Sequence, residues 1–300
     1  GGLTEKIKGI YIDKKARFFD SLLPLFYAKY IKDIRSVGIL LGPYRNLSTL
    51  TASLMALHPN CQVLNHAGIR VFNYKWVNFL ENYSDQKFSN FLKFAVYASL
   101  HGRRGPFGGG IFNSHAFDHD VVRKKYFERY NSNLKPNIHS IVWKEPLQVT
   151  NVIKQNSFSD ILDNNQKLKF LLPIRNPINC AKSNLKTRHY KIFNKEVNNT
   201  KNCIAAIFEE FLLFLQLKDQ YPTNFFYFFE DELKDKLTDI AEFLKIEKDQ
   251  KWIEDASECF VVKSKYDNEE ELKKEAIDLA NYYFEHYPVF KNHLMYLVRK

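Results

Sequence analysis

Short apolar runs alternate along the chain with longer stretches in which apolar residues recur at helical spacing. The runs are apolar throughout, which is typical of strands that are covered on both faces of a parallel sheet. They predict strands at residues 37–41, 61–64, 138–144, 168–174 and 225–229. The helical spacing predicts helices at residues 48–57, 118–131, 148–155, 179–188, 201–219 and 232–244, two more within 74–100, and a mostly helical C-terminal third. Strands that alternate with helices imply a parallel sheet with right-handed crossovers.

The pattern continues without an internal repeat or a low-complexity linker. We therefore expect one α/β domain over residues 1–300. Residues 1–35 precede the first strand and read as a basic, partly helical lead-in. The hydrophobic share of 45% is ample for a core.

The net charge of +10 favours anionic partners, namely nucleic acid, an acidic membrane surface or a polyphosphorylated small molecule, and does not choose among them. Isolated cysteines without a CxxC pair or zinc spacing indicate small buried residues in a reducing compartment, so we expect a cytoplasmic location. They are Cys61, Cys180, Cys203 and Cys259. We expect no signal peptide, and the apolar stretch 22–30 is too short to span a bilayer.

The turn between the first strand and the first helix is a candidate anion site. It reads GPYRNL over residues 42–47, and the next helix begins with Ser48 and Thr49. A helix N-terminus presents free N–H groups and the positive end of a dipole, and Arg45 adds a full charge. We expect this turn to hold a phosphate or a sulfate. The alternative is an ordinary strand–turn–helix in which Ser48 only caps the helix.

A second candidate lies where the strand at 168–174 ends. Arg175 follows that strand directly, and ligands of open parallel sheets bind at the carboxyl ends of the strands. Ser183 comes eight residues later, two turns into the next helix. A guanidinium fork matches a phosphate, and a helix serine can add a further hydrogen bond. The alternative for Arg175 is a surface ion pair.

Together these stretches resemble the motifs of sulfotransferases that use 3′-phosphoadenosine 5′-phosphosulfate (PAPS). The family's first motif reads roughly G-x-P-[RK]-S-G-T-[TS]-L followed by H-P after a helix; here residues 42–50 read GPYRNLSTL, and His58-Pro59 follow. The family's second motif, R-[DN]-P-x5-S, is matched by residues 175–183. The likeness is closest to the bacterial and tyrosylprotein branches.

Two further motifs strengthen the resemblance. The family often has a strand that ends in K-[SDT]-P, and here residues 144–146 read KEP. It also has an aromatic strand followed by E-D-L and a helix that ends F-L-G-[LI]; here residues 230–233 read EDEL and residues 243–246 read FLKI. The chain departs from the first motif at Asn46-Leu47, where the family usually has Ser-Gly. The glycine-rich C-terminal loop of the cytosolic branch is not visible.

The resemblance implies a P-loop-like, three-layer α/β/α fold with a central parallel sheet of about five strands and helical additions. It covers residues 36–246 as the core and leaves residues 247–300 as a helical C-terminal part. It also implies that PAPS is the sulfuryl donor and that 3′-phosphoadenosine 5′-phosphate (PAP) is the product. Residues that should cradle the 5′-phosphosulfate are Arg45, Asn46, Leu47, Ser48 and Thr49, and those that should hold the 3′-phosphate are Arg175 and Ser183.

The implied reaction is in-line transfer of a sulfuryl group to a hydroxyl or an amine, with a general base and with cations that stabilise the leaving phosphate. Arg45 and Lys144 are the expected cations, and His66 occupies the place of the base in related enzymes. The alternatives are a solvated lysine at a strand end and a histidine that is satisfied by backbone groups. Other candidate bases are His115, His119 and Glu145.

The segment 101–120 holds five of the eleven glycines and is expected to be a loop. Such a loop can close over a site, with Arg103 and Arg104 facing anionic groups, or it can be a disordered excursion. His115 and His119 are four residues apart, a spacing that can bind a metal on a helix. We expect a helix start there and no metal, because the chemistry of the family needs none.

Two other classes of function stay open on the sequence alone. A P-loop kinase or phosphotransferase is related in fold, but the chain lacks the GxxxxGK[ST] lysine. A nucleic-acid-binding protein fits the net charge, but the basic residues are scattered and we expect no nucleic-acid partner. A degenerate protein that binds PAPS without turnover is a further possibility. The expected acceptor is a small molecule, a carbohydrate or a peptide, and the oligomeric state is not predicted.

Overall fold

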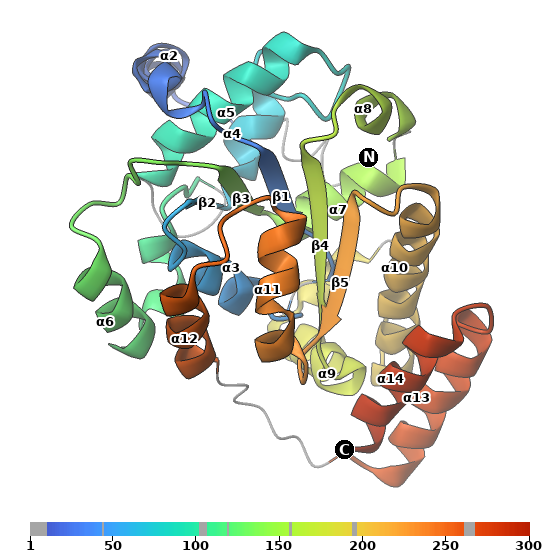
Figure 1. The fold of residues 1–300 in the computed structure, drawn as a ribbon. Coiled ribbons are helices and arrows are strands. Elements are labelled where there is room, and N and C mark those ends of the chain that lie inside the picture. The colour runs from blue at the N-terminus through green and yellow to red at the C-terminus, as the bar shows by residue number, and fades with distance from the viewer. Residues whose placement is uncertain are drawn as a thin grey trace.

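The computed structural model describes residues 11–43, 45–101, 107–118, 120–155, 158–193, 197–260 and 268–300. Within these residues, five strands form one all-parallel sheet in the order β2-β3-β1-β4-β5 (Figure 1). The strands are β1 (Ser36–Leu40), β2 (Cys61–Asn65), β3 (Ser140–Lys144), β4 (Leu168–Ile174) and β5 (Phe225–Phe229). All five predicted strands are present, so the α/β fold with a parallel sheet is confirmed.

Helices cover both faces of the sheet, and an apolar cluster on each face packs the helices against it. One cluster joins the sheet to α4 (Gly68–Asn73), α5 (Asp85–Ser99), α7 (Pro146–Gln155), α8 (Ser159–Asn164), α9 (Pro177–Thr187) and α10 (Thr200–Gln220). The other joins it to α3 (Ser48–Ala56), α6 (Asp120–Arg129), α11 (Leu233–Phe243) and α12 (Gln250–Cys259). The predicted three-layer α/β/α arrangement is therefore present.

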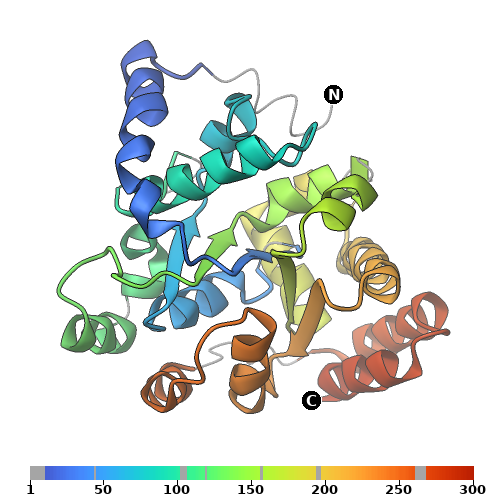
Figure 2. The same cartoon turned by 45° about the horizontal axis from the view of Figure 1, so that its top comes forward.

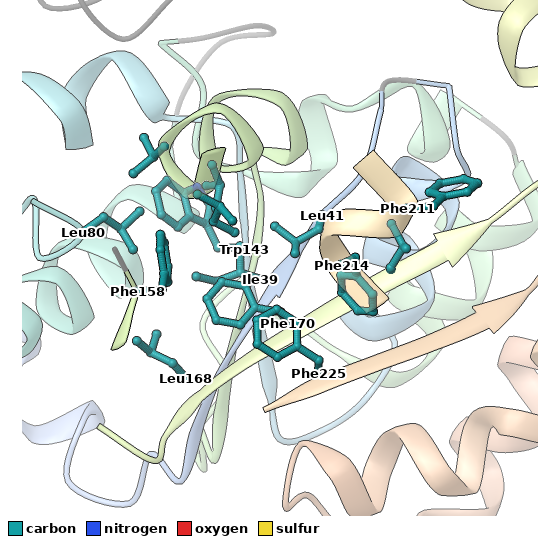
Figure 3. Packing of buried hydrophobic residues seen from close by; sticks show 14 of the residues in the cluster. Ile39, Leu41, Leu80, Trp143, Phe158, Leu168, Phe170, Phe211, Phe214 and Phe225 are labelled. Atoms are coloured by element: carbon teal, nitrogen blue, oxygen red, sulfur yellow. The ribbon is translucent and has the colours of Figure 1, made fainter. Parts of the chain in front are cut away.

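Successive side chains of β1 point to opposite faces of the sheet, so this strand contributes residues to both clusters. Val37 and Ile39 point to the first cluster and Leu40 to the second, as the period of a strand requires. Figure 3 shows the first cluster, where the rings of Phe170 and Phe225 stack with centroids 4.9 Å apart. Both faces of the strand are buried, which explains why the strands read as continuous apolar runs.

Two helices follow the core at the β5 side of the molecule. They are α13 (Glu270–Tyr283) and α14 (Pro288–Arg299), and Figures 1 and 2 show them as a pair beside α10. Phe290 joins the pair to the rest, because its ring lies 5.3 Å from that of Tyr227 and 5.4 Å from that of Phe229, both in β5. The predicted helical C-terminal third is therefore confirmed.

The lead-in is helical, as expected, over α2 (Lys14–Leu22) and the 3₁₀ helix η1 (Leu23–Tyr30), which packs against α5. The prediction of two helices within residues 74–100 is wrong, because residues 74–84 form turns and only α5 is present there. Apolar spacing in the turn segment has a different cause: Phe79 packs against Phe88 and Phe91 of α5. The short helices α4 and α8 were not predicted.

The turn between α3 and β2 is closed by a buried lysine. The Lys135 Nζ donates to the carbonyl oxygens of Ala56, His58 and Cys61, the last two at 2.7 Å. These groups include the last carbonyl of α3, so Lys135 satisfies a helix end that would otherwise be buried without donors. Burial lowers the pKa of Lys135 to about 7. All four cysteines are free and buried. No helix in the described part of the chain is long and apolar enough to cross a membrane.

Candidate functional site

Side chains that the sequence analysis selected follow the carboxyl ends of four strands. Arg45 follows β1, His66 follows β2, Lys144 ends β3 and Arg175 follows β4. These strands are neighbours in one parallel sheet, so their carboxyl ends lie along one edge, where open α/β sheets bind ligands. We call this edge the candidate site.

The turn after β1 has an unusual backbone. Gly42 has a φ of 114°, and Arg45 and Leu47 have φ angles of 64° and 62°. A Cβ atom on Gly42 would lie 2.9 Å from the side chain of Leu172, so this glycine is needed for both space and conformation. Left-handed non-glycine residues carry strain, and such residues cluster at functional sites. Tyr44 lies outside the described residues.

Helix α3 begins without a side-chain cap. Its N-cap residue is Leu47, and Ser48 is the first helical residue, so the interpretation of Ser48 as a simple cap is wrong. Ser48 is also almost fully buried, with 4% of its surface exposed. In the described part of the chain, no acceptor takes the backbone N–H groups of Asn46 and Leu47. The start of α3 therefore has the free donors that an anion site requires.

Asn46 is fully buried and serves the neighbouring strand with its side chain. Its Nδ2 donates to the carbonyl oxygen of Pro173, and its Oδ1 accepts from the backbone N–H of Arg175 at 2.9 Å. The last ladder bond between β1 and β4 runs from the Leu41 N–H to the Leu171 carbonyl. The carboxamide thus acts as one more peptide group of β1 and extends the ladder by two bonds. The motif resemblance suggested a ligand amide here, whereas the carboxamide bonds to β4 through both its nitrogen and its oxygen.

The two candidate anion elements are joined directly. The Arg45 Nε donates to the Ser183 Oγ at 2.8 Å, although the two residues are 138 positions apart. The Arg175 Nη1 lies 3.4 Å from the Arg45 carbonyl oxygen. Among the described residues, the buried Arg175 Nε has no hydrogen-bond partner. The turn after β1, Arg175 and the middle of α9 therefore form one connected basic and hydroxyl-bearing cluster.

A second cluster stands at the ends of β2 and β3. The Lys144 Nζ lies 3.4 Å from the His66 Nε2, and the His66 Nδ1 lies 3.5 Å from the Glu145 Oε1. The other Glu145 oxygen accepts from the backbone N–H of Gly68 at 3.0 Å, which fixes the carboxylate. With the proton assigned to Nδ1, the His66 ring donates to Glu145 and leaves Nε2 as an acceptor. Histidine and glutamate thus form an oriented acid–base pair.

Burial controls the charge of Lys144. Burial is the main cause that lowers the pKa of this lysine to about 8; the charge of Glu145 opposes the shift, and the charge of Arg45 contributes to it. In the sheet, Lys144 pairs with Leu40, the last residue of β1, on one side and with Asn65, the residue before His66, on the other. The cluster at β2 and β3 and the turn after β1 therefore belong to the same site.

The backbone at the candidate base is strained and firmly held. His66 and Ala67 have φ angles of 63° and 66°, two consecutive left-handed residues. The His66 N–H donates to the Lys144 carbonyl at 2.8 Å, and the Trp143 Nε1 donates to the His66 carbonyl at 2.8 Å. These bonds fix the backbone while the ring keeps polar neighbours, so His66 is more than a histidine that backbone groups satisfy.

The end of the glycine-rich segment lies beside β2. The Asn65 N–H donates to the Gly109 carbonyl at 2.8 Å, next to His66 in the chain. A Cβ atom on Gly109 would lie 1.9 Å from the Ala98 carbonyl oxygen, so only glycine fits there. Arg103, Arg104 and His119 lie outside the described residues, and of His115 only the backbone, in a 3₁₀ helix, is described. Within the described residues, no cluster of His, Cys, Asp and Glu could hold a metal ion.

Two residues at the site were missed by sequence reasoning. Glu230 follows β5 in the predicted E-D motif, and burial raises the pKa of its carboxyl group, against the opposing effects of the Asn176 N–H and the Arg175 charge. His189 follows α9, and burial and then the charge of Arg45 lower the pKa of its ring. The E-D motif could have identified Glu230 as a site residue, whereas no motif or residue spacing in the sequence points to His189.

Comparisons with known proteins gave no match to a protein-family model or to a curated protein. Solved structures that resemble the chain include the sulfotransferase domain of the Synechococcus PCC 7002 olefin synthase, at 14% identity and a TM-score of 0.38, covering 83% of this chain and 94% of that one. Sulfotransferase STF9 from Mycobacterium avium is similar at 12% identity and a TM-score of 0.43, with 90% and 80% covered. Mouse sulfotransferase SULT7A1, complexed with PAP, is similar at 10% identity and a TM-score of 0.42, with 92% and 93% covered.

Proposed function

We propose that the chain is a sulfotransferase that moves the sulfuryl group of PAPS to a hydroxyl or amine of a small-molecule, carbohydrate or peptide acceptor. The observation that carries this proposal is the hydrogen bond between Arg45 and Ser183, which joins the anion turn to the middle of α9. Two adjoining anion sites at one sheet edge suit a nucleotide with phosphates at both of its ends. Sulfuryl donation also fits the motif resemblance.

The proposed binding roles follow from the free groups of the site. Backbone N–H groups of residues 45–49 hold the 5′-phosphosulfate at the positive end of α3. The Arg175 guanidinium, with its buried free Nε, and the Ser183 hydroxyl hold the 3′-phosphate. Asn46 contributes its backbone only, because its carboxamide is committed to β4.

The proposed chemistry is a single in-line displacement. PAPS supplies the sulfuryl group; the acceptor oxygen or nitrogen forms a bond to sulfur as the bond from sulfur to the leaving phosphate oxygen breaks. The His66 Nε2 takes the acceptor proton, and Glu145 stabilises the imidazolium that results. Arg45 and the Lys144 ammonium offset the charge that grows on the leaving phosphate. Lys144 lies between His66 and the turn, so it can exchange its contact with His66 for that phosphate.

Ligand-dependent thermal stability tests the proposal directly. PAP and PAPS should each raise the melting temperature, whereas ATP with Mg²⁺ should not. Stabilisation by ATP–Mg²⁺ alone would favour a phosphotransferase, and a salt-dependent affinity for DNA or RNA without PAP binding would favour a nucleic-acid-binding protein. Binding of PAP without turnover in a screen of acceptors with labelled PAPS would indicate a degenerate enzyme.

Matched variants separate the proposed roles. Arg175→Ala should weaken PAP binding by at least about tenfold, the usual scale for a charge-assisted contact. Arg35→Ala is the control, because Arg35 is an exposed arginine at the opposite end of β1. His66→Ala should retain PAP affinity and lose turnover. Wild-type turnover in that variant would assign the base elsewhere.

A further inference from the structure

Exposed apolar side chains are concentrated in the N-terminal lead-in. Of the twelve large apolar residues that are exposed in the described part of the chain, six fall within residues 11–26: Tyr11, Phe18, Phe19, Leu22, Leu25 and Phe26. Phe18 is 59% exposed and Phe26 is 72% exposed. Single exposed apolar residues are normal, but the concentration of six in one short segment indicates an interaction surface. We call these six residues the N-terminal apolar surface.

Helix α2 turns its apolar side outward and a polar side inward. Phe18 and Leu22 are four residues apart and so share a face of the helix. Asp20 lies on the opposite side, where it is buried and accepts from the Tyr74 hydroxyl at 2.5 Å. It also pairs with the Arg70 Nη1 at 3.3 Å. Figures 1 and 2 both show α2 at the periphery of the molecule.

This orientation is the reverse of that of a helix on a water-facing surface, which buries its apolar stripe. The Asp20 contacts anchor the helix to α4 and the residue after it, so the outward direction of the phenylalanines is fixed by the fold. Anchoring of this kind leaves the apolar side chains available to a partner.

Basic residues flank the N-terminal apolar surface. Exposed lysines stand on both sides of its phenylalanines and leucines in the chain, namely Lys14, Lys15, Lys29 and Lys32. Over residues 11–35 the chain has six basic and three acidic residues, and one of the acidic residues is the buried Asp20. Phenylalanine and leucine on one side with lysine beside them are the composition of helices that lie in a membrane interface. The charges choose an anionic bilayer over a neutral one.

We propose that α2 and η1 dock this protein peripherally on an anionic lipid bilayer. Phe18, Leu22 and Phe26 enter the boundary between headgroups and acyl chains, and the flanking lysines contact lipid phosphates. The helices lie along the surface and do not span it, because residues 14–30 are too few and too polar to cross the hydrocarbon core. This role is independent of the reaction at the candidate site.

Vesicle sedimentation with the full chain tests the proposal. Binding is expected to phosphatidylcholine vesicles that contain about 30% phosphatidylglycerol, with little binding to pure phosphatidylcholine, and it should decrease as salt rises from about 0.1 M to 1 M. The double variant Phe18→Ser/Phe26→Ser should bind at least about tenfold more weakly. Tyr282→Ser/Val289→Ser is the matched control, since it removes two apolar residues that are 78% and 80% exposed on α13 and α14. The control should bind as the wild type does.

Three results would overturn the proposal. The first is equal binding of wild type and Phe18→Ser/Phe26→Ser. The second is a wild-type dimer that this double variant converts to a monomer, which would assign the surface to a second copy of the chain. The third is vesicle binding that develops only after deletion of residues 1–10, which would assign the surface to that segment. Thermal unfolding of the variants establishes that they are folded, and their substituted side chains are exposed.

Discussion

Lys144 combines deep burial with a position between a histidine and an anion turn. Its pKa of about 8 compares with an ordinary value of 10.5. Between these two pH values the unfolded chain holds a proton that the folded chain has released, so the free energy of unfolding rises with pH across this window. Below pH 8 the buried ammonium costs stability. A bound anion would offset that cost. The buried ammonium therefore favours ligand binding while it lowers the stability of the free protein.

The pH dependence of PAP binding should therefore follow Lys144. As pH rises above about 8 the free protein loses the ammonium, and PAP affinity should decrease by up to about tenfold per pH unit. Calorimetry in buffers with different ionisation enthalpies should detect proton uptake on binding. Lys144→Arg is the control, because a guanidinium stays charged over this range and should flatten the profile. An unchanged profile in that variant would assign the titration to another group.

Asn46 offers a second prediction at this scale. Asn46→Ala leaves the Pro173 carbonyl and the Arg175 N–H without their partner, which should cost about 2–4 kcal/mol of unfolding free energy. Asn46→Ser restores the residue of the family motif, but one hydroxyl is too short to serve both groups and should recover only part of the loss. Urea unfolding would rank the variants, and wild-type stability in Asn46→Ser would refute the account of Asn46 as an added peptide group.

The sequence could select the candidate residues at the strand ends, but it could not predict the contacts that support them. Arg45, Lys144 and Arg175 stand at strand ends, and strand ends are visible as the limits of apolar runs. The partners of Asn46 lie 127 and 129 positions away, and no local pattern reports a contact between side chain and backbone over that distance. Its expected role as a ligand amide came from the motif resemblance, and only the packing of β1 against β4 shows that the carboxamide bonds to β4.

At the scale of elements, α11 ends in a motif that favours glycine. The Ile246 N–H donates to the Ala241 carbonyl at 3.0 Å, and the Lys245 N–H donates to the Glu242 carbonyl at 3.0 Å. This is the Schellman arrangement, in which the residue after the cap adopts a left-handed conformation. Lys245 has a φ of 56° and occupies the glycine position of the family's F-L-G-[LI] motif.

Lys245→Gly should therefore stabilise the protein by about 1 kcal/mol, because it removes the left-handed strain and the lost side chain is exposed. Lys248→Gly, at an exposed position nearby without a positive φ, should give no gain. Urea unfolding of both variants measures the difference. A loss of stability in Lys245→Gly would mean that the lysine side chain contributes packing that outweighs the backbone strain.

The strands and most helices were predictable because their periodicity is local. Turns that bury apolar residues were not predictable, as residues 74–84 show. Their aromatic spacing resembles a helix, but the rings are directed to α5 by the turn and not by a helical period. Only the tertiary position of α5 distinguishes the two cases.

At the scale of the whole molecule, the C-terminal helices brace the candidate site from outside. The Asn176 Nδ2, at the start of α9, donates to the Leu297 carbonyl of α14 at 2.8 Å. His293 of α14 stacks on Phe229, with ring centres 3.9 Å apart, and its Nε2 lies 2.8 Å from an Asp231 oxygen. The ends of β4 and β5 are thus held by a segment that contributes no residue to the candidate site. We propose on this basis that α13 and α14 unfold together with the rest of the molecule as one domain.

Phe290→Ala tests that proposal. Phe290 is 2% exposed and its ring contacts aromatic rings of β5, α10 and the end of α13, so its loss should cost about 3–5 kcal/mol. All three tryptophans precede residue 268, so tryptophan fluorescence follows the rest of the molecule while far-ultraviolet circular dichroism follows all helices. In a single domain both signals shift together to lower urea. Val289→Ala, at the adjacent 80% exposed position, should leave both unchanged. An early dichroism transition with unshifted fluorescence in Phe290→Ala would show that α13 and α14 unfold separately.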